Sequence, residues 1–276
     1  MEEKTRILFV VHEMTPFLEL SSIAKLTREL PQAIQEKGFE IRCFMPRFGS
    51  INERRNRLHE VIRLSGMNIV VNDTDNPLII KVASIPQARM QVYFLDNEDY
   101  FQKKQVFHNS KNTMLKNNDE KALFFCKGVI ETVKKLGWMP DIVHCHDWFA
   151  GLLPVLMKTK FANDPIFSEA KVIYSAYENS FNGELSDKYA KLLEMEGIDS
   201  DALEHFKKST CTNLQKAAIQ YADATIKGSE KLDSGVESYL MTQDTRVIDY
   251  QTEETYVDTY FDFYKELLEE NLVLAE

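Results

Sequence analysis

Short apolar segments alternate with helical patterns along most of this chain, and this alternation constrains the fold more than any other feature. Residues 7–11 (ILFVV) form a continuous apolar run, typical of a parallel strand in a sheet covered on both faces. A helical pattern over about 23–36 follows, and Gly38 is placed to end it. The next apolar run, 39–46 (FEIRCFMP), completes a β-α-β unit.

The same alternation continues to about residue 240. Shorter strands, some of them antiparallel, are predicted within 59–95. Further strands are predicted at DIVHCH (141–146), KVIYSAY (171–177) and DATIKGS (223–229). Helices are predicted at 123–137, at AGLLPVLMKTK (150–160) and over a long stretch at about 186–221. We therefore expect an α/β fold with a single Rossmann-like, mostly parallel sheet and helices on both of its faces.

The turn after the first strand lacks the glycines that a phosphate-binding turn needs. Such turns bring backbone N–H groups close to a phosphate at a helix N-terminus, and side chains would block that approach. This turn carries Glu19, Leu20, Ser21 and Ser22, and no glycine occurs before Gly38. Ser21 and Ser22 are candidate caps of the helix. We expect the scaffold to be kept and the phosphate chemistry to be lost.

Composition excludes several other kinds of protein. A net charge of −10 argues against nucleic-acid binding, because the chain has no overall positive field. No charged leader and no apolar run long enough for a membrane span is present, so we expect no membrane insertion and a cytoplasmic location. The four cysteines form no CxxC pair and are expected to be buried free thiols: Cys43, Cys126, Cys145 and Cys211.

The motif HCHD at 144–147 suggests a metal site or a nucleophile, but both are less favoured than a structural role. On a strand, His144 and His146 share one face, and Cys145 and Asp147 share the other. No third ligand lies nearby in the sequence, so hydrogen-bonded core histidines are favoured and neither a metal nor another cofactor is expected. Cys145 has no recognisable base or oxyanion-binding partner.

Two further features have open alternatives. A loop after the second strand carries four arginines, which indicate either a solvated loop or an anion- or partner-binding patch: Arg47, Arg54, Arg55 and Arg57. Trp148 could stack on a sugar ring or pack in the core.

The last residues differ in character from the rest. Tyr256, Tyr260, Phe263 and Leu267 lie at helical spacing beside seven carboxylates between 253 and 270. We favour an amphipathic helix within 249–276 that docks on a domain of residues 1–248, and the alternative is a partner-binding helix.

One segment carries a family resemblance. The segment 137–158 (GWMPDIVHCHDWFAGLLPVLMK) resembles the bacterial glycogen/starch synthase family, in which a Pro-Asp-hydrophobic-hydrophobic-His-x-His-Asp-Trp motif ends a strand of the N-terminal domain. Further blocks agree in order and spacing: 7–17, 30–51, 92–101 and 220–229. The resemblance covers about residues 5–240. It implies the acceptor-side half of a GT-B glycosyltransferase, in a family that transfers glucose from ADP-glucose to an α-1,4-glucan.

The chain departs from the family at positions that matter for catalysis. Glu19, Leu20, Ser21 and Ser22 stand where the family has Lys-Thr-Gly-Gly, so a carboxylate replaces a cation near the diphosphate. Tyr177 and Glu178 replace a His-Asn pair at the reacting sugar, and Phe149 replaces a histidine. The substrate-binding candidates that the resemblance leaves are Glu13, Asp96, Asn97, Asp147, Trp148 and Tyr177.

These departures lead to competing functional expectations. Only about 35 residues follow the last matched block, fewer than the roughly 100 of a typical domain, so we expect the donor-binding half to be missing. The favoured hypothesis is an α-glucan-binding or regulatory homologue with little or no activity alone. The alternatives are a glucosyltransferase half that needs a separately encoded donor domain or self-association, and a module that only binds a partner.

Overall fold

The computed structural model describes residues 4–85, 88 and 90–274. In this part of the chain, strands form one mixed sheet with the order β10-β9-β8-β7-β1-β2-β6-β5-β3, and β4 pairs with β5. The strands are β1 (Arg6–Val10), β2 (Glu40–Pro46), β3 (His59–Glu60), β4 (Met67–Val71), β5 (Thr74–Ile85), β6 (Met90–Asp96), β7 (Ile142–His146), β8 (Lys171–Ala176), β9 (Ala224–Lys227) and β10 (Arg246–Ile248).

The central strands are parallel, as predicted. β1 lies between β2 and β7, and the pairs β7–β8, β8–β9, β9–β10 and β2–β6 are also parallel. The strands β3, β4 and β5 add an antiparallel extension beyond β6. The chain moves from β1 to β2 on one side and later returns to β7 on the other. A crevice therefore opens at the carboxyl ends of β1 and β7, where open α/β sheets bind their ligands.

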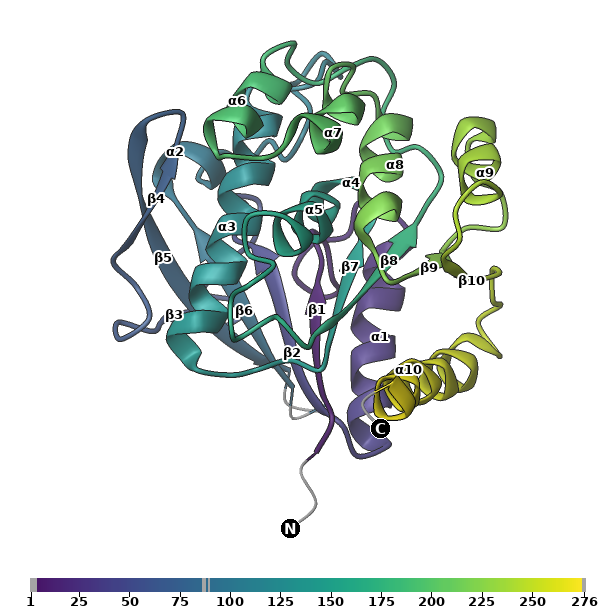
Figure 1. The fold of residues 1–276 in the computed structure, drawn as a ribbon. Coiled ribbons are helices and arrows are strands. Elements are labelled where there is room, and N and C mark those ends of the chain that lie inside the picture. Colours follow the sequence, from purple (N-terminus) through teal and green to yellow (C-terminus); the bar gives the residue numbers. More distant parts are fainter. Residues whose placement is uncertain (1–3, 86–87, 89, 275–276) are drawn as a thin grey trace.

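Helices cover both faces of this sheet (Figure 1). The helices α3, α5 and α8 lie on one face, and α1 and α10 lie together on the other (Figure 1). The helices are α1 (Ile23–Glu36), α2 (Glu98–Phe101), α3 (Asn118–Leu136), α4 (Asp147–Ala150), α5 (Leu152–Lys158), α6 (Tyr189–Met195), α7 (Ser200–Leu203), α8 (Cys211–Tyr221), α9 (Ser234–Leu240) and α10 (Tyr256–Leu274), with a 3₁₀ turn at Glu204–Phe206. No helix in the described ranges is long and apolar enough to cross a membrane.

The predicted helix ends are confirmed where glycine ends them. Gly38 and Gly137 follow α1 and α3 with φ of 108° and 59°, in the region that residues with a Cβ rarely adopt. The predicted capping by Ser22 is wrong, because its side chain makes no capping bond. Instead the hydroxyl of Ser21 accepts a hydrogen bond from the backbone N–H of Ile23 at 3.1 Å.

The long helical stretch predicted over about 186–221 is divided into several helices. Gly197, with φ of 80°, follows α6, and the chain turns there. A new helix, α8, begins after Thr210, whose hydroxyl accepts from the backbone N–H of Asn213. The four cysteines are buried free thiols, as predicted.

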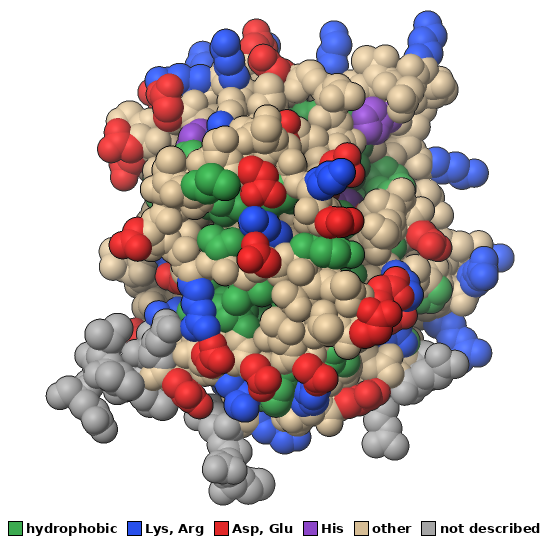
Figure 2. All heavy atoms as spheres, turned by 90° about the vertical axis from the view of Figure 1, so that its right-hand side faces the viewer, with side chains coloured by type: hydrophobic (Ala, Val, Ile, Leu, Met, Phe, Trp, Pro, Cys, Tyr) green, Lys and Arg blue, Asp and Glu red, His purple; other side chains and the backbone are tan. Residues whose placement is uncertain are grey.

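Helix α10 lies against α1 with one apolar side turned inward. The buried side chains on this side are those of Tyr256, Tyr260, Phe263, Tyr264 and Leu267. The opposite side of the helix exposes Asp258, Asp262 and Glu266, and acidic side chains gather over this part of the molecule (Figure 2). The non-helical residues 249–255 lead into the helix.

Candidate functional site

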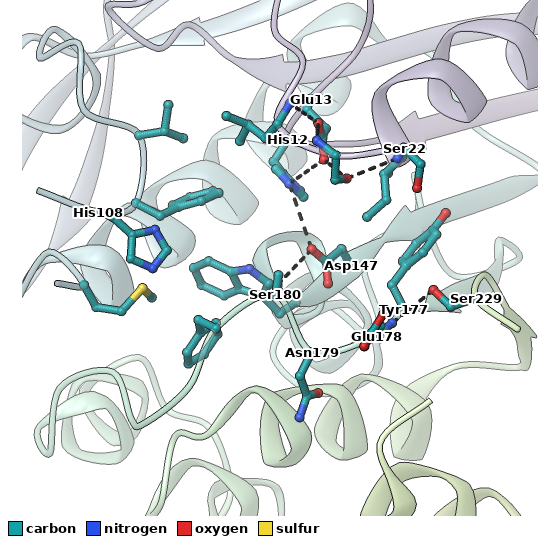
Figure 3. Close-up of a pocket in the computed structure, with 18 residues that line it drawn as sticks. His12, Glu13, Ser22, His108, Asp147, Tyr177, Glu178, Asn179, Ser180 and Ser229 are labelled. Atoms are coloured by element: carbon teal, nitrogen blue, oxygen red, sulfur yellow. Dashed lines mark hydrogen bonds and ion pairs between the residues drawn. The ribbon is translucent and has the colours of Figure 1, made fainter. Parts of the chain in front are cut away.

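A cavity of about 580 Å³ opens at the crevice between β1 and β7 (Figure 3). Five loops form its walls, from after β1, before α3, after β7, after β8 and after β9. The lining residues are His12, Glu13, Leu20, Ser21, Ser22, Ile23, Val106, Phe107, His108, Met114, Asp147, Trp148, Tyr177, Glu178, Asn179, Ser180, Phe181 and Ser229. Four of the predicted candidates, Glu13, Asp147, Trp148 and Tyr177, therefore lie together here.

Asp147 lies at the centre of this group, between His12 and Ser180 (Figure 3). Its φ of 62° is unusual for a residue with a side chain, although Asp and Asn tolerate it better than most. This turn ends β7 and starts α4, so Asp147 does not continue the strand as predicted. Burial raises the pKa of the Asp147 carboxyl, and the positive charge that His12 can carry opposes the shift. The Oδ1 atom is buried without a hydrogen-bond partner in the described structure.

His12 connects the two carboxylates of the cavity. Its Nε2 lies 3.4 Å from Oε1 of Glu13 and 3.9 Å from Oδ2 of Asp147. The hydroxyl of Ser180 donates to the same Asp147 oxygen at 3.3 Å. Sequence reasoning missed His12 and Ser180. The position of His12, beside Glu13 at the carboxyl end of an apolar strand, is the signal that could have identified it.

Glu13 holds the loop that leads into α1. Its Oε2 accepts from the backbone N–H groups of Leu20 and Ser21 at 2.6 and 2.9 Å, and its Oε1 accepts from the hydroxyl of Ser21 at 2.6 Å. Burial opposes ionisation of Glu13, but the bonds from His12, Ser21 and Leu20 outweigh it and lower its pKa. The carboxylate of the chain itself thus occupies N–H groups that face an anion in phosphate-binding turns.

Aromatic rings form another wall of the cavity. Trp148 is buried, and its ring lies 4.9 Å from Phe107 and 5.1 Å from Phe181, both at steep angles. Phe149, where the resemblance leads one to expect a histidine, is fully buried and stacks on Phe125. The apolar contacts fix the orientation of Trp148, which also lines the cavity.

Tyr177 lines the cavity and is held on several sides. Its hydroxyl lies 2.8 Å from Nδ1 of His146, and its backbone N–H donates to Gln215. A Cβ atom at Gly228 would lie 2.4 Å from its ring, so only glycine leaves room for the tyrosine there. Burial raises the pKa of Tyr177 well above its ordinary value, so the phenol remains protonated at neutral pH.

Asp96 and Asn97 do not line this cavity. The Asp96 carboxylate forms ion pairs with Arg47 at 2.8 Å and Lys81 at 2.9 Å. Asn97 instead caps α2 by accepting from the backbone N–H groups of Asp99 and Tyr100. The solvated-loop prediction is wrong for Arg47, which is buried by its pairing with Asp96. Within the described ranges, no group of three or more His, Cys, Asp and Glu side chains could hold a metal ion.

The comparisons with known proteins agree with this fold. The family model for the starch synthase catalytic domain matches residues 6–242. A glycogen synthase of Chlorobium limicola is 40% identical over 221 residues, covering 79% of this chain and 44% of the relative. A glycogen synthase of Pelodictyon phaeoclathratiforme is 37% identical over 242 residues, covering 85% and 48%. The chain therefore spans about half the length of the curated relatives it matches.

The solved structures extend this likeness to the fold. The catalytic domain of starch synthase IV from Arabidopsis thaliana, bound to ADP and acarbose, superimposes with a TM-score of 0.73 at 16% identity. The match covers 91% of this chain and 52% of that one, which corresponds to one Rossmann-like half of a GT-B fold. From the matched family model and the similarity to these glycogen synthases, the chain belongs to the starch synthase catalytic domain family.

Proposed function

We propose that this chain binds an α-1,4-glucan in the cavity described above and does not transfer glucose by itself. The charge of the cavity carries this proposal. Glu13, Asp147 and Glu178 line it, and no Lys or Arg is among the described residues that do so. Carboxylates accept hydrogen bonds from sugar hydroxyls, whereas they repel a diphosphate.

The other lining groups suit a neutral, hydroxyl-rich ligand. Asn179, Ser180 and Ser229 can donate and accept hydrogen bonds, and the rings of Phe107 and Trp148 offer apolar contact. The Arabidopsis protein was solved with ADP and acarbose bound. In this chain a diphosphate would have to displace the Glu13 carboxylate from the backbone N–H groups of Leu20 and Ser21.

Isothermal titration calorimetry tests the proposal with three ligands. We expect binding of maltohexaose, much weaker binding of cellohexaose, and no binding of ADP at the same concentration. The control is Asp244→Asn on the exposed surface, which should bind maltohexaose as the original chain does. Equal affinity for both hexasaccharides, or ADP binding tighter than maltohexaose, would contradict the proposal.

A second candidate is a glucosyltransferase half completed by a separately encoded donor domain or by self-association. The observation that favours it is the coverage of only 44–48% of the matched glycogen synthases. Incubation with ADP-glucose or UDP-glucose and a glucan primer, with and without cell extract, tests it. Extract-dependent turnover that Asp147→Asn abolishes and Asp244→Asn preserves would favour this candidate. Equal turnover with either variant would contradict it.

A further inference from the structure

A row of buried polar contacts connects helix α10 to the wall of the cavity. The hydroxyl of Tyr264, on α10, lies 2.8 Å from Nδ1 of His144. Nε2 of His144 lies 2.7 Å from the hydroxyl of Ser175, and the His144 ring packs against the ring of His146. The Tyr177 hydroxyl in turn lies 2.8 Å from Nδ1 of His146. Of these five residues, Tyr177 reaches the cavity and Tyr264 belongs to α10.

The strand geometry explains why these residues meet. His144 and His146 alternate along β7, so both point to the same face of the sheet, and their ring centroids are 4.0 Å apart. Ser175 pairs with His146 across the parallel register between β7 and β8, and Tyr177 follows two residues later. Two imidazoles on a fully buried face need hydrogen-bond partners, and α10 supplies one of them through Tyr264.

We propose that Tyr264 is a positioning residue for the cavity, which acts through His144 and His146 to fix the orientation of Tyr177. This inference rests on the proposed function only where it concerns glucan affinity. The row of contacts itself can be tested without any ligand. Its consequence is that α10 is part of the binding apparatus as well as a cover for the sheet.

His146 hydrogen bonds to the Tyr177 hydroxyl through Nδ1, and its Nε2 is buried without a partner in the described structure. The His146 ring also packs against the ring of His144. A shift of the His144 ring therefore acts on His146 by packing, and on Tyr177 through the bond to His146.

Nitrogen-15 NMR of the histidine side chains in the full protein tests this row of contacts directly. We expect Tyr264→Phe, which removes only the hydroxyl, to shift the ring resonances of His146 although the two residues do not bond to each other. The matched control is Tyr256→Phe on the same helix. The Tyr256 hydroxyl donates to Glu29, which is not part of this row of contacts. His146 resonances that move equally in both variants, or in neither, would overturn the proposal.

Ser175→Ala removes the other hydrogen-bond partner of His144, should Tyr264→Phe fail to fold. It should shift the His146 resonances without removing any contact of α10, and unchanged resonances would overturn the proposal. Titration of maltohexaose, followed by Trp148 fluorescence, measures the effect on the cavity. We expect about three- to tenfold weaker binding for Tyr264→Phe and unchanged binding for Tyr256→Phe.

The two proposals can fail separately. If the original chain does not bind maltohexaose, the proposed function fails, and the NMR measurement still decides whether Tyr264 positions His146 and Tyr177. If maltohexaose binds and Tyr264→Phe has the same affinity as Tyr256→Phe, the positioning role fails while the proposed function stands.

Discussion

At the scale of single residues, the two carboxylates of the cavity have opposite effects on stability. Glu13 accepts hydrogen bonds from several neighbouring groups, and these bonds lower its pKa. Asp147 is buried with fewer partners, and its pKa is raised by that burial. Glu13 therefore stabilises the folded chain at neutral pH, whereas ionised Asp147 costs stability. A destabilising group retained in a cavity is typical of a residue that serves a ligand.

Replacing Glu13 by Gln should destabilise the fold by about 2–4 kcal/mol at pH 7, because charge-assisted bonds to Leu20, Ser21 and His12 are lost. A group with a lowered folded pKa stabilises above its unfolded pKa, and this stability is lost as the pH falls through the folded pKa. The difference from the original chain should therefore shrink in acid. Urea unfolding at pH 7 and pH 4 measures it, with the exposed Glu19→Gln as control. A Glu13→Gln cost that matches the control would contradict the prediction.

Asp147→Asn should have the opposite effect on stability. A carboxyl with a raised folded pKa stabilises below its unfolded pKa, and that contribution is lost as the pH rises through the folded pKa. The amide removes the buried charge and tolerates the same φ, so we expect a gain on the order of 1 kcal/mol at pH 7. Maltohexaose affinity should fall about tenfold or more. Urea unfolding and calorimetry on the same samples measure both, and a variant that loses stability would argue against this account of Asp147.

At the scale of elements, α10 contributes a buried aromatic surface to the domain. Tyr256, Tyr260, Phe263, Tyr264 and Leu267 are all at most 6% exposed. We propose that residues 249–276 brace a domain formed by residues 1–248. The helix also forms ion pairs between Asp258 and Lys37, just after α1, and between Glu266 and Arg246 on β10. These pairs are exposed, so we attribute most of the stabilisation to the aromatic contacts.

Truncating one of these aromatic side chains tests the brace. Phe263→Ala should lower the free energy of unfolding by about 3–5 kcal/mol, because it leaves a cavity under α10. The control is Asp262→Ala, which changes the neighbouring exposed residue and removes only its ion pair with Lys265, for a change below about 0.5 kcal/mol. Urea unfolding followed by circular dichroism measures both. If the two variants are equally stable, α10 does not brace the domain.

Sequence patterns predicted those elements that depend on local signals. Continuous apolar runs located β1, β2, β7, β8 and β9, because buried parallel strands need no alternation of polar residues. The breaks within 186–221 were not predicted, since the polar and apolar residues there keep a helical spacing across the turn at Gly197.

The candidate site was predicted in part for a related reason. The family motif located Asp147 and Trp148 correctly. The resemblance also proposed Asp96, because the sequence does not show that its carboxylate pairs with buried Arg47 and lies outside the cavity. The contact between Tyr264 and His144 depends on tertiary packing across 120 residues of sequence, and no local pattern encodes it.

At the scale of the whole molecule, the buried pair of histidines, His144 and His146, makes the stability of the fold sensitive to acid. Burial lowers the pKa of His146 to about 3, and it lowers that of His144 well below its ordinary value. Unfolded histidines bind protons near pH 6.5, so the unfolded state gains protons first as the pH falls. Stability is therefore present at neutral pH and lost on acidification, before most carboxylates titrate.

The free energy of unfolding should consequently fall by roughly 4 kcal/mol between pH 7 and pH 5, from these two histidines alone. His146→Asn should reduce that fall by about half, whatever its own cost at pH 7. His59→Asn, which changes an exposed histidine, should leave the pH dependence as it is. Urea midpoints across this range measure all three proteins. A flat pH profile of the original chain would show that the buried histidines do not govern its acid sensitivity.

The position of α10 has a consequence for how the molecule is made. Phe9, on the first strand, contacts both His144 and Tyr264, so the surface that α10 covers is synthesised early and closed late. On the ribosome, this strip of sheet stays uncovered, with its imidazoles exposed, until the residues of α10 have emerged. A nascent chain halted before Tyr256 would present that strip to chaperones, and the strip would be covered only once α10 has been translated.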